Sequence, residues 1–221
     1  MKEEEISIEL YLKHNIISRE FRENLIEHLK NNKELDIKKF QKEFDNEKKI
    51  NISENSNILE AYELVYDATE YLNRKMDDPG LELLDKALEL DPENEQALNI
   101  KMDVIQSHNK PDDAEKIADK LINMKFLNTE IYVNAYKIKS CVLLTKGFET
   151  KNKNLLIKSL DCCNKGLKIE SDDYDLTIQK AGILFQLGRK EFNEYLKKAS
   201  KIDKKRTELF MKHYWIDEKI I

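Results

Sequence analysis

Hydrophobic residues recur every three or four positions from Leu59 to Ile202, the spacing that places them on one face of an α-helix. Five glycines and three prolines interrupt the 221-residue chain, and these are the residues that most often end a helix or form a turn. Regular alternation occurs only near the start, from Ile6 to Leu12. A single strand would lack a partner in an otherwise helical chain, so helix is the favoured interpretation there too. The pattern predicts an all-α protein.

The three prolines mark expected helix starts. Asp78-Pro79, Asp91-Pro92 and Lys110-Pro111 each place proline at the first helical position, where its missing N–H group is not needed. The aspartates before Pro79 and Pro92 are residues that cap helix N-termini. Pro92 is expected to end one helix and open the next, which predicts tight helical hairpins.

The segment from Lys86 to Leu98, KALELDPENEQAL, resembles the tetratricopeptide repeat family, whose unit is a helix–turn–helix of about 34 residues. Ala87 and Pro92 have the family's spacing between a small residue late in the second helix and the proline between units. Equivalent positions follow at Leu121, Gly166 and Ala199, at spacings of 34, 45 and 33 residues. The resemblance covers residues 60–203, and the long spacing implies an insertion at Glu149–Asn154.

The expected fold class is therefore stacked helical hairpins forming an α-solenoid with helical N- and C-terminal caps. A hairpin cannot bury its apolar face alone, so hairpins must stack. About four units are expected over residues 59–203. Small residues let the helices approach each other and large ones fill the gaps; the small positions are Ala68, Ala87, Ala114, Ala118 and Gly166, and the large ones are Leu64, Tyr71, Leu84 and Tyr136.

Two flanking segments lie outside the repeats. Residues 1–58 contain short helical stripes, and they form either a helical cap or a separate arm. Residues 204–221 are expected to form a capping helix, because a repeat array needs a cover for its last open face. The alternative for this second segment is an exposed partner-binding surface around Trp215.

The charge is unevenly distributed. The net charge is −5, but residues 59–132 contain 8 basic and 18 acidic side chains, whereas residues 133–221 contain 19 basic and 12 acidic ones. In a linear stack the two excesses, −10 and +7, would favour weak head-to-tail self-association. Alternatively, both excesses lie on solvated faces and only keep the protein soluble.

Composition excludes several classes of protein. No stretch approaches the ~20 apolar residues that cross a bilayer, and the first residues lack the order of a signal peptide. The three cysteines are an odd number, which favours a reducing, cytoplasmic location. Histidines and cysteines are not spaced as metal ligands, and no phosphate loop or nucleophile motif is present. We therefore expect no enzyme activity, metal or cofactor.

The resemblance implies a protein-interaction scaffold whose first helices line a concave groove for a peptide segment or partner helix. Carried over position by position, the groove residues are Tyr62, Val65, Thr69, Asn73, Gln96, Asn99, Asp103, Asn134 and Lys137, with Leu72, Gln106, Cys141, Leu144, Ile178 and Phe185 in further positions. Val65 and Thr69 stand where some family members have the first lysine and asparagine of a carboxylate clamp, which argues against that kind of binding. The groove is otherwise neutral, polar and rich in asparagine and glutamine.

A nucleic-acid-binding protein is the alternative function. Six basic residues lie within ten positions of one another, flanked by aromatic side chains that could stack on bases: Lys197, Lys198, Lys201, Lys204, Lys205 and Arg206, beside Tyr195, Phe210, Tyr214 and Trp215. The chain as a whole is acidic, which disfavours this alternative.

Overall fold

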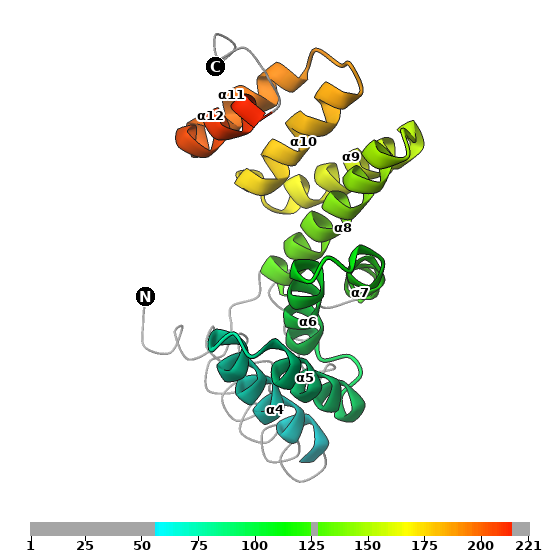
Figure 1. Cartoon of the computed structure of the whole chain (residues 1–221), viewed down its shortest axis with the longest axis vertical. Helices are drawn as coiled ribbons and strands as arrows, with labels where there is room; N and C mark the ends of the chain where they lie inside the picture. The colour runs from blue at the N-terminus through cyan, green and yellow to red at the C-terminus, as the bar shows by residue number, and fades with distance from the viewer. Residues whose placement is uncertain (1–55, 125–127, 214–221) are drawn as a thin grey trace, which may run out of the picture. The chain divides into compact units, whose positions relative to one another are not determined.

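The computed structural model describes residues 56–124 and 128–213, and over these ranges the secondary structure is helical, with no strand (Figure 1). The chain forms two compact units, Met1–Ala97 and Leu98–Ile221. The expectations for residues 1–55, including the strand-or-helix question and the choice between cap and arm, lie outside the described residues. The same is true of Trp215.

Unit 1 contains α4 (Ser56–Asn73) and α5 (Asp77–Leu90), which pack as a hairpin. Its interior is lined mainly by small side chains, and Ala61, Ala68, Leu84 and Ala87 are fully buried. Gly80 on α5 lies against α4 so closely that an added Cβ atom would be 2.7 Å from Leu72 Cγ. The small positions therefore set the distance between the two helices.

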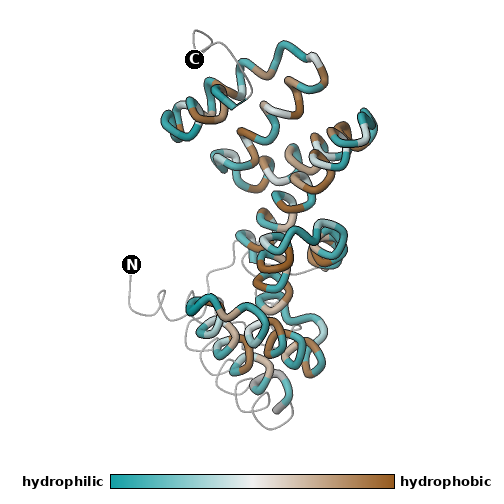
Figure 2. Tube along the Cα trace, viewed as in Figure 1, coloured by the Kyte–Doolittle hydropathy of each residue, from teal (hydrophilic) through white to brown (hydrophobic). Residues whose placement is uncertain are grey.

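Unit 2 begins within α6 (Glu95–Ser107) and continues through α7 (Pro111–Asn123), α8 (Thr129–Glu149), α9 (Lys153–Ile169), α10 (Tyr174–Gln186), α11 (Phe192–Ile202) and α12 (Lys204–His213). Helix α8 packs against α7, α9 and α10, and α10 packs against α9 and α11. Figure 2 shows hydrophobic residues as separate bands along each helix rather than as continuous runs. Each helix therefore buries one face, as the helical period predicts.

The same turn joins each pair of helices. Lys75, Asn109, Lys151 and Gly188 all have positive φ angles, between 53° and 68°. Around Lys151, the N–H of Asn152 donates to the carbonyl of Gly147 at 2.9 Å, and around Gly188 the N–H of Arg189 donates to Leu184 at 2.9 Å. This is the Schellman pattern, which satisfies the last carbonyls of a helix. Only one of these four residues is a glycine. The feature shared by the four turns that end α4, α6, α8 and α10 is therefore the hydrogen-bond pattern and not a glycine.

The proline expectation is correct only for Pro111, which is the first residue of α7. Pro79 is the third residue of α5, and Pro92 lies in the turn before α6. Proline is tolerated throughout a first turn because those N–H groups have no partner within the helix. The side chain that caps α6 is Asn94, whose Oδ1 accepts the N–H of Ala97 at 3.0 Å.

The expected insertion at Glu149–Asn154 is not a long loop. Helix α8 has 21 residues and α9 has 17, compared with 13 each in α6, α7 and α10. Only Thr150–Asn152 connects α8 to α9, and Asn152 Oδ1 caps α9 by accepting the N–H of Asn154 at 3.0 Å. The extra residues therefore lengthen the hairpin itself.

The predicted core positions are largely confirmed. Ala68, Ala87, Ala114 and Ala118 have no exposed surface, and Leu84, Tyr136 and Gly166 are buried. The prediction for Tyr71 is wrong, because its side chain is 39% exposed while Leu72, one position later, meets Gly80. In α12 the apolar residues divide between two faces, since Met211 is buried and Leu209 is 59% exposed.

Candidate functional site

Asn134 on α8 connects three of the predicted groove residues in unit 2. Its Nδ2 donates to Asn99 Oδ1 at 2.8 Å and to Asp103 Oδ1 at 3.0 Å, and both acceptors are on α6. Asn99 and Asp103 are four positions apart, so they lie one above the other on a single helix face. The structure therefore brings these three predicted residues together.

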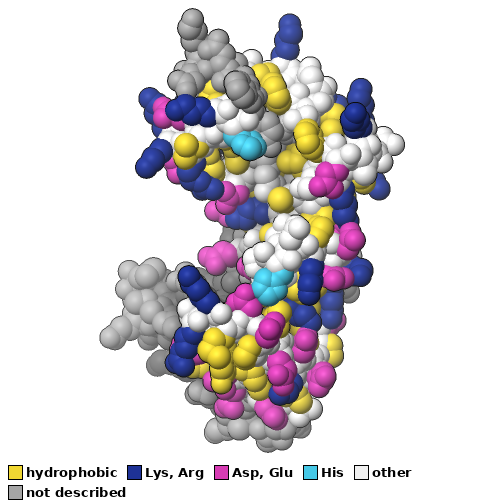
Figure 3. Space-filling model, in the orientation of Figure 1, with side chains coloured by type: hydrophobic (Ala, Val, Ile, Leu, Met, Phe, Trp, Pro, Cys, Tyr) yellow, Lys and Arg dark blue, Asp and Glu magenta, His cyan; other side chains and the backbone are white. Residues whose placement is uncertain are grey.

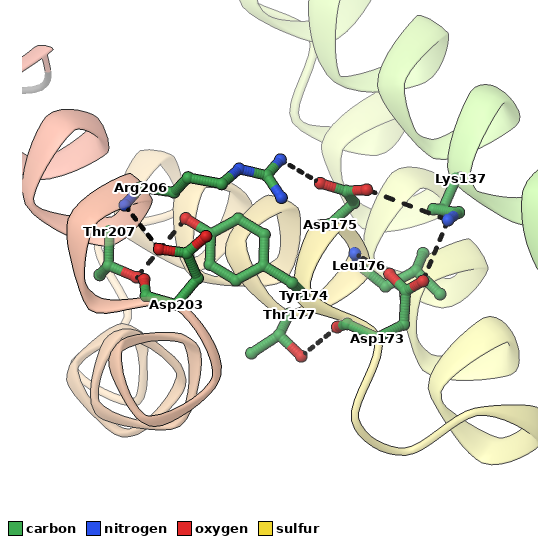
Figure 4. Close-up of polar contacts among 9 residues, drawn as sticks. All are labelled: Lys137, Asp173, Tyr174, Asp175, Leu176, Thr177, Asp203, Arg206 and Thr207. Atoms are coloured by element: carbon green, nitrogen blue, oxygen red, sulfur yellow. Dashed lines mark hydrogen bonds and ion pairs between the residues drawn. The ribbon is translucent and has the colours of Figure 1, made fainter.

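Lys137 continues the same stripe one turn further along α8. Its Nζ donates to Asp173 Oδ2 at 3.0 Å and lies 3.9 Å from Asp175 Oδ2 (Figure 4). Arg206 on α12 reaches the other oxygen of Asp175, with Nη2 2.6 Å from Oδ1. Its guanidinium also lies 4.1 Å from the centre of the Tyr174 ring, a stacking arrangement that favours a cation.

Polar side chains thus connect α6, α8, α10 and α12 in sequence. We refer to this set as the polar ladder: Asn99, Asp103, Asn134, Lys137, Asp173, Asp175 and Arg206. Sequence reasoning found the first four members but missed Asp173, Asp175 and Arg206 as parts of the same surface.

A local signal could have identified the two helix starts that carry the missed members. Asp173 and Asp203 each precede a helix by one residue, and their Oδ1 atoms accept the N–H groups of Leu176 at 2.7 Å and Arg206 at 3.0 Å. A threonine four positions after each aspartate donates its hydroxyl back to the aspartate carbonyl, at 2.7 Å in both places. This repeated Asp-x-x-x-Thr start holds the first turns of α10 and α12, from which the ladder side chains project (Figure 4).

The charges of the ladder largely compensate one another. Desolvation raises the pKa of Asp103, while the hydrogen bond from Asn134 and the charge of Lys137 oppose that rise. Lys137 and Arg206 are both paired with aspartates of the ladder. Since both cations already have carboxylate partners, the surface does not resemble a clamp built to receive a terminal carboxylate.

The remaining predicted groove residues differ in accessibility. In unit 1, Tyr62, Thr69 and Gln96 are half-buried and Asn73 is exposed. Val65 is 4% exposed, so it belongs to the interior rather than to a ligand-contacting surface. In unit 2, Ile178 is buried in the core cluster around Leu196 and Met211, against which Phe185 also packs.

The cysteines show no sign of activation. All three are free thiols, and burial raises the pKa of Cys162 to about 11 and that of Cys163 to about 12. Both side chains are buried. Cys141 is half-buried along the α8 stripe, and burial raises its pKa as well. Over the described ranges no group of three or more His, Cys, Asp or Glu side chains could hold a metal ion.

Several members of the basic cluster already have acidic partners. Arg206 pairs with Asp175, Lys204 Nζ lies 3.8 Å from Glu208, and Lys198 Nζ lies 3.7 Å from Asp172. The ring of Tyr195 is covered by Lys180, whose Nζ is 4.1 Å from the ring centre. Figure 3 shows acidic side chains among the lysines and arginines of the surface. These contacts give no support to the nucleic-acid alternative.

Comparison with known proteins gives structural matches only. No family model and no curated protein matches the sequence. Among solved structures, YrrB, a TPR protein with an unusual peptide-binding site, aligns with a TM-score of 0.56 at 16% identity, covering 77% of this chain and 84% of that one. TTC0263, a TPR protein of Thermus thermophilus, aligns with a TM-score of 0.53 at 16% identity, covering 65% and 75%. A MamA structure aligns with a TM-score of 0.55 at 15% identity, covering 72% and 85%.

None of the described helices has both the length and the hydropathy needed to cross a membrane. The repeated helix pairs with their left-handed turns, together with these structural matches, show that the chain has the tetratricopeptide-repeat fold.

Proposed function

We propose that this protein is an interaction scaffold that binds a peptide segment of another protein along the polar ladder of unit 2. The observation that carries the proposal is the hydrogen bonding of Asn134 to both Asn99 and Asp103. A side-chain amide has two N–H donors and a carbonyl acceptor. The described hydrogen bonds use the donors of Asn134 and hold its amide in one orientation, which leaves Oδ1 as an acceptor for a ligand N–H group.

The fold supports the same proposal. YrrB, which has a similar fold, is a TPR protein with a peptide-binding site. Residues of the ladder come from α6, α8, α10 and α12, so they recur at the repeat spacing along one surface of unit 2. An extended peptide presents backbone donors and acceptors at a regular spacing, and a ladder of amides and carboxylates can pair with them.

A selection experiment tests the proposal. The full chain is immobilised and used to select binders from a random 12-residue peptide display library, and the affinity of the selected peptides is measured by fluorescence polarisation. Asn134→Ala should weaken binding by about tenfold, equivalent to about 1.4 kcal/mol. Asn123→Ala, at an exposed position on α7, is the matched control and should leave the affinity unchanged. Failure to select any peptide, or equal effects of the two substitutions, would contradict the proposal.

We also propose a cytoplasmic location, and the thiols support it. Cys141, Cys162 and Cys163 are all free, which favours the reducing cytoplasmic location proposed from their odd number. Fractionation of the native host with an antibody against the chain tests this location, and recovery in an oxidising compartment would contradict it.

A further inference from the structure

The hairpin of α8 and α9 carries exposed hydrophobic side chains near its turn. Phe148 is 60% exposed and Ile157 is 49% exposed, although large apolar residues elsewhere on α8, such as Val142 and Leu143, are buried. Helix α8 is eight residues longer than α6 and α10. The long helices thus end in a segment whose apolar side chains are not covered by neighbouring hairpins.

Phe148 and Ile157 lie on the same side of this hairpin. Gly147 and Leu156 meet across it, since a Cβ atom on Gly147 would be 2.9 Å from Leu156 Cδ2. Phe148 follows Gly147 and Ile157 follows Leu156. Each side chain is therefore turned by about 100° around its helix, relative to the contact residue before it. In two antiparallel helices this rotation carries both side chains to the same side, so they form one apolar patch.

The patch extends the stripe that carries the polar ladder along α8. Phe148 follows Lys137 by eleven positions and Cys141 by seven, which are close to three and two helical turns. Lys137 is a member of the ladder, and Cys141 is only half-buried. The surface of α8 therefore changes from polar at Asn134 to apolar at Phe148 without leaving one helix face.

Three lysines lie close to the apolar patch in the sequence. Lys151, Lys153 and Lys158 are exposed, and no ion pair involves them among the described residues. Lys153 precedes Ile157 by four positions, so it lies on the same stripe of α9. By contrast, Lys146, one turn before the hairpin end, is held by Asp112 and Glu115 at 2.6 and 2.5 Å. Glu149 is the acidic residue closest to the patch in sequence. Because three lysines stand against this one glutamate, the hairpin end has an excess of positive charge.

We propose that this hairpin end, formed by Phe148, Lys151, Lys153, Ile157 and Lys158, docks an acidic protein segment that carries a large apolar side chain. The apolar residue of the partner covers Phe148 and Ile157, and its carboxylates approach the lysines. This inference rests on the proposed function, because it places one end of the bound peptide on the hairpin. A protein segment is favoured over other anionic partners because the patch is continuous with the amides of the ladder along α8.

The test uses the same 12-residue peptide library on the full chain. Selected peptides should be enriched in Asp and Glu on either side of a Leu, Ile, Met or Phe. The double substitution Phe148→Ser/Ile157→Ser should weaken their binding by at least about tenfold, the size expected when an apolar anchor at an interface is removed. Lys151→Glu/Lys153→Glu should weaken it similarly, and more strongly at 50 mM than at 500 mM NaCl, because salt screens exposed charges.

Leu209→Ser is the matched control, since Leu209 is also exposed, at 59%, but lies on α12. It should not change the affinity, and circular dichroism of each variant should match that of the original chain. Vesicles containing phosphatidylserine and a poly-dT oligonucleotide serve as the competing probes.

The outcomes separate this inference from the proposed function. Peptides that lose affinity with Asn134→Ala but not with the hairpin substitutions would overturn the inference and leave the proposed function standing. Hairpin-dependent binding to vesicles or oligonucleotide, with no hairpin-dependent peptide binding, would also overturn it. Absence of any bound peptide would overturn both.

Discussion

Asp173 links α10 to α8 through one carboxylate. Its Oδ1 accepts the backbone N–H of Leu176 at 2.7 Å, and its Oδ2 accepts from Lys137 Nζ at 3.0 Å. The aspartate side chain is 10% exposed and the lysine side chain 24% exposed. A helix cap and an interhelical ion pair are therefore combined in one largely buried group.

Replacement of these two residues should have unequal effects. Asp173→Ala removes the cap and the ion pair together, and it should lower the free energy of unfolding by about 1–2 kcal/mol. Lys137→Met removes only the ion pair, keeps much of the aliphatic stem and leaves Asp173 bonded to the N–H of Leu176, so it should cost less, about 1 kcal/mol. Urea unfolding followed by circular dichroism measures both. A larger loss for Lys137→Met than for Asp173→Ala would show that the cap is unimportant.

Ala87 and Lys86 are neighbours with opposite environments. Ala87 has no exposed surface, whereas Lys86 is exposed and pairs with Glu82 at 2.7 Å. Ala87→Asp places an unpaired charge against α4 and should cost several kcal/mol or prevent folding of unit 1. Lys86→Asp should be nearly neutral, because exposed ion pairs contribute little to stability. Equal shifts of the urea midpoint would show that the repeat phase of α5 is wrong.

Gly166 lies where α9 packs closely against Leu176 of α10 and Tyr136 of α8. A Cβ atom there would be 2.5 Å from Leu176 Cδ1 and 3.3 Å from Tyr136 Cβ. Gly166→Ala should therefore lower the free energy of unfolding by about 1–3 kcal/mol, the usual cost of overpacking a core.

Gly188 offers a control of a different kind. It has a φ of +68° and nothing within 4 Å of its Cβ position, so only backbone conformation constrains it. Gly188→Asn should be nearly neutral, because asparagine tolerates this conformation and Asn109 already occupies the equivalent turn. Thermal unfolding of both variants checks these expectations, and a neutral Gly166→Ala would contradict the close approach.

The buried thiols should resist alkylation in the folded protein. Burial raises the pKa of Cys163 from its ordinary value of 9.0 to about 12, so at pH 8 it is protonated and the reactive thiolate is scarce. Iodoacetamide at pH 8 should label Cys141 first, and it should label Cys162 and Cys163 only after unfolding, as read by peptide mass spectrometry.

The same pKa shift determines the direction of a stability change with pH. Between pH 9 and about 12 the unfolded chain loses the Cys163 proton and the folded chain keeps it. The folded state then binds more protons, so the contribution of Cys163 to stability is fully present below pH 9 and decreases as the pH rises through this window. Cys163→Ala should remove that part of the pH dependence. An unchanged alkaline profile in this variant would contradict the assignment.

The uneven charge predicts weak self-association at low ionic strength. Residues 59–132 carry −10 and residues 133–221 carry +7, so an acidic region of one copy can attract a basic region of another. The association should disappear at 1 M salt, where the Debye length is about 3 Å. Sedimentation velocity over a range of concentrations at low and high salt measures it, and a single monomeric species throughout would leave the charges a role in solubility alone.

The amino-acid sequence was sufficient to predict the helices and the repeat. The helical period and the small residues at Ala68, Ala87 and Gly166 can be recognised within one hairpin, and the repeat can be recognised from the spacing of equivalent positions along the chain. The stripe that carries Asn134 and Lys137 was predicted from the resemblance to the tetratricopeptide repeat family, position by position.

Only the tertiary structure decided which polar side chains meet. Asn134 lies 35 positions from Asn99 and Lys137 lies 36 positions from Asp173, so their pairing depends on how neighbouring hairpins are rotated and spaced. Packing also buried Val65 and turned the expected insertion into extra turns of α8 and α9, which expose Phe148. The pairing and the burial of these side chains depend on small rotations of whole helices. Such a rotation moves a side chain between the interior and the surface without changing the hydrophobic pattern of the sequence.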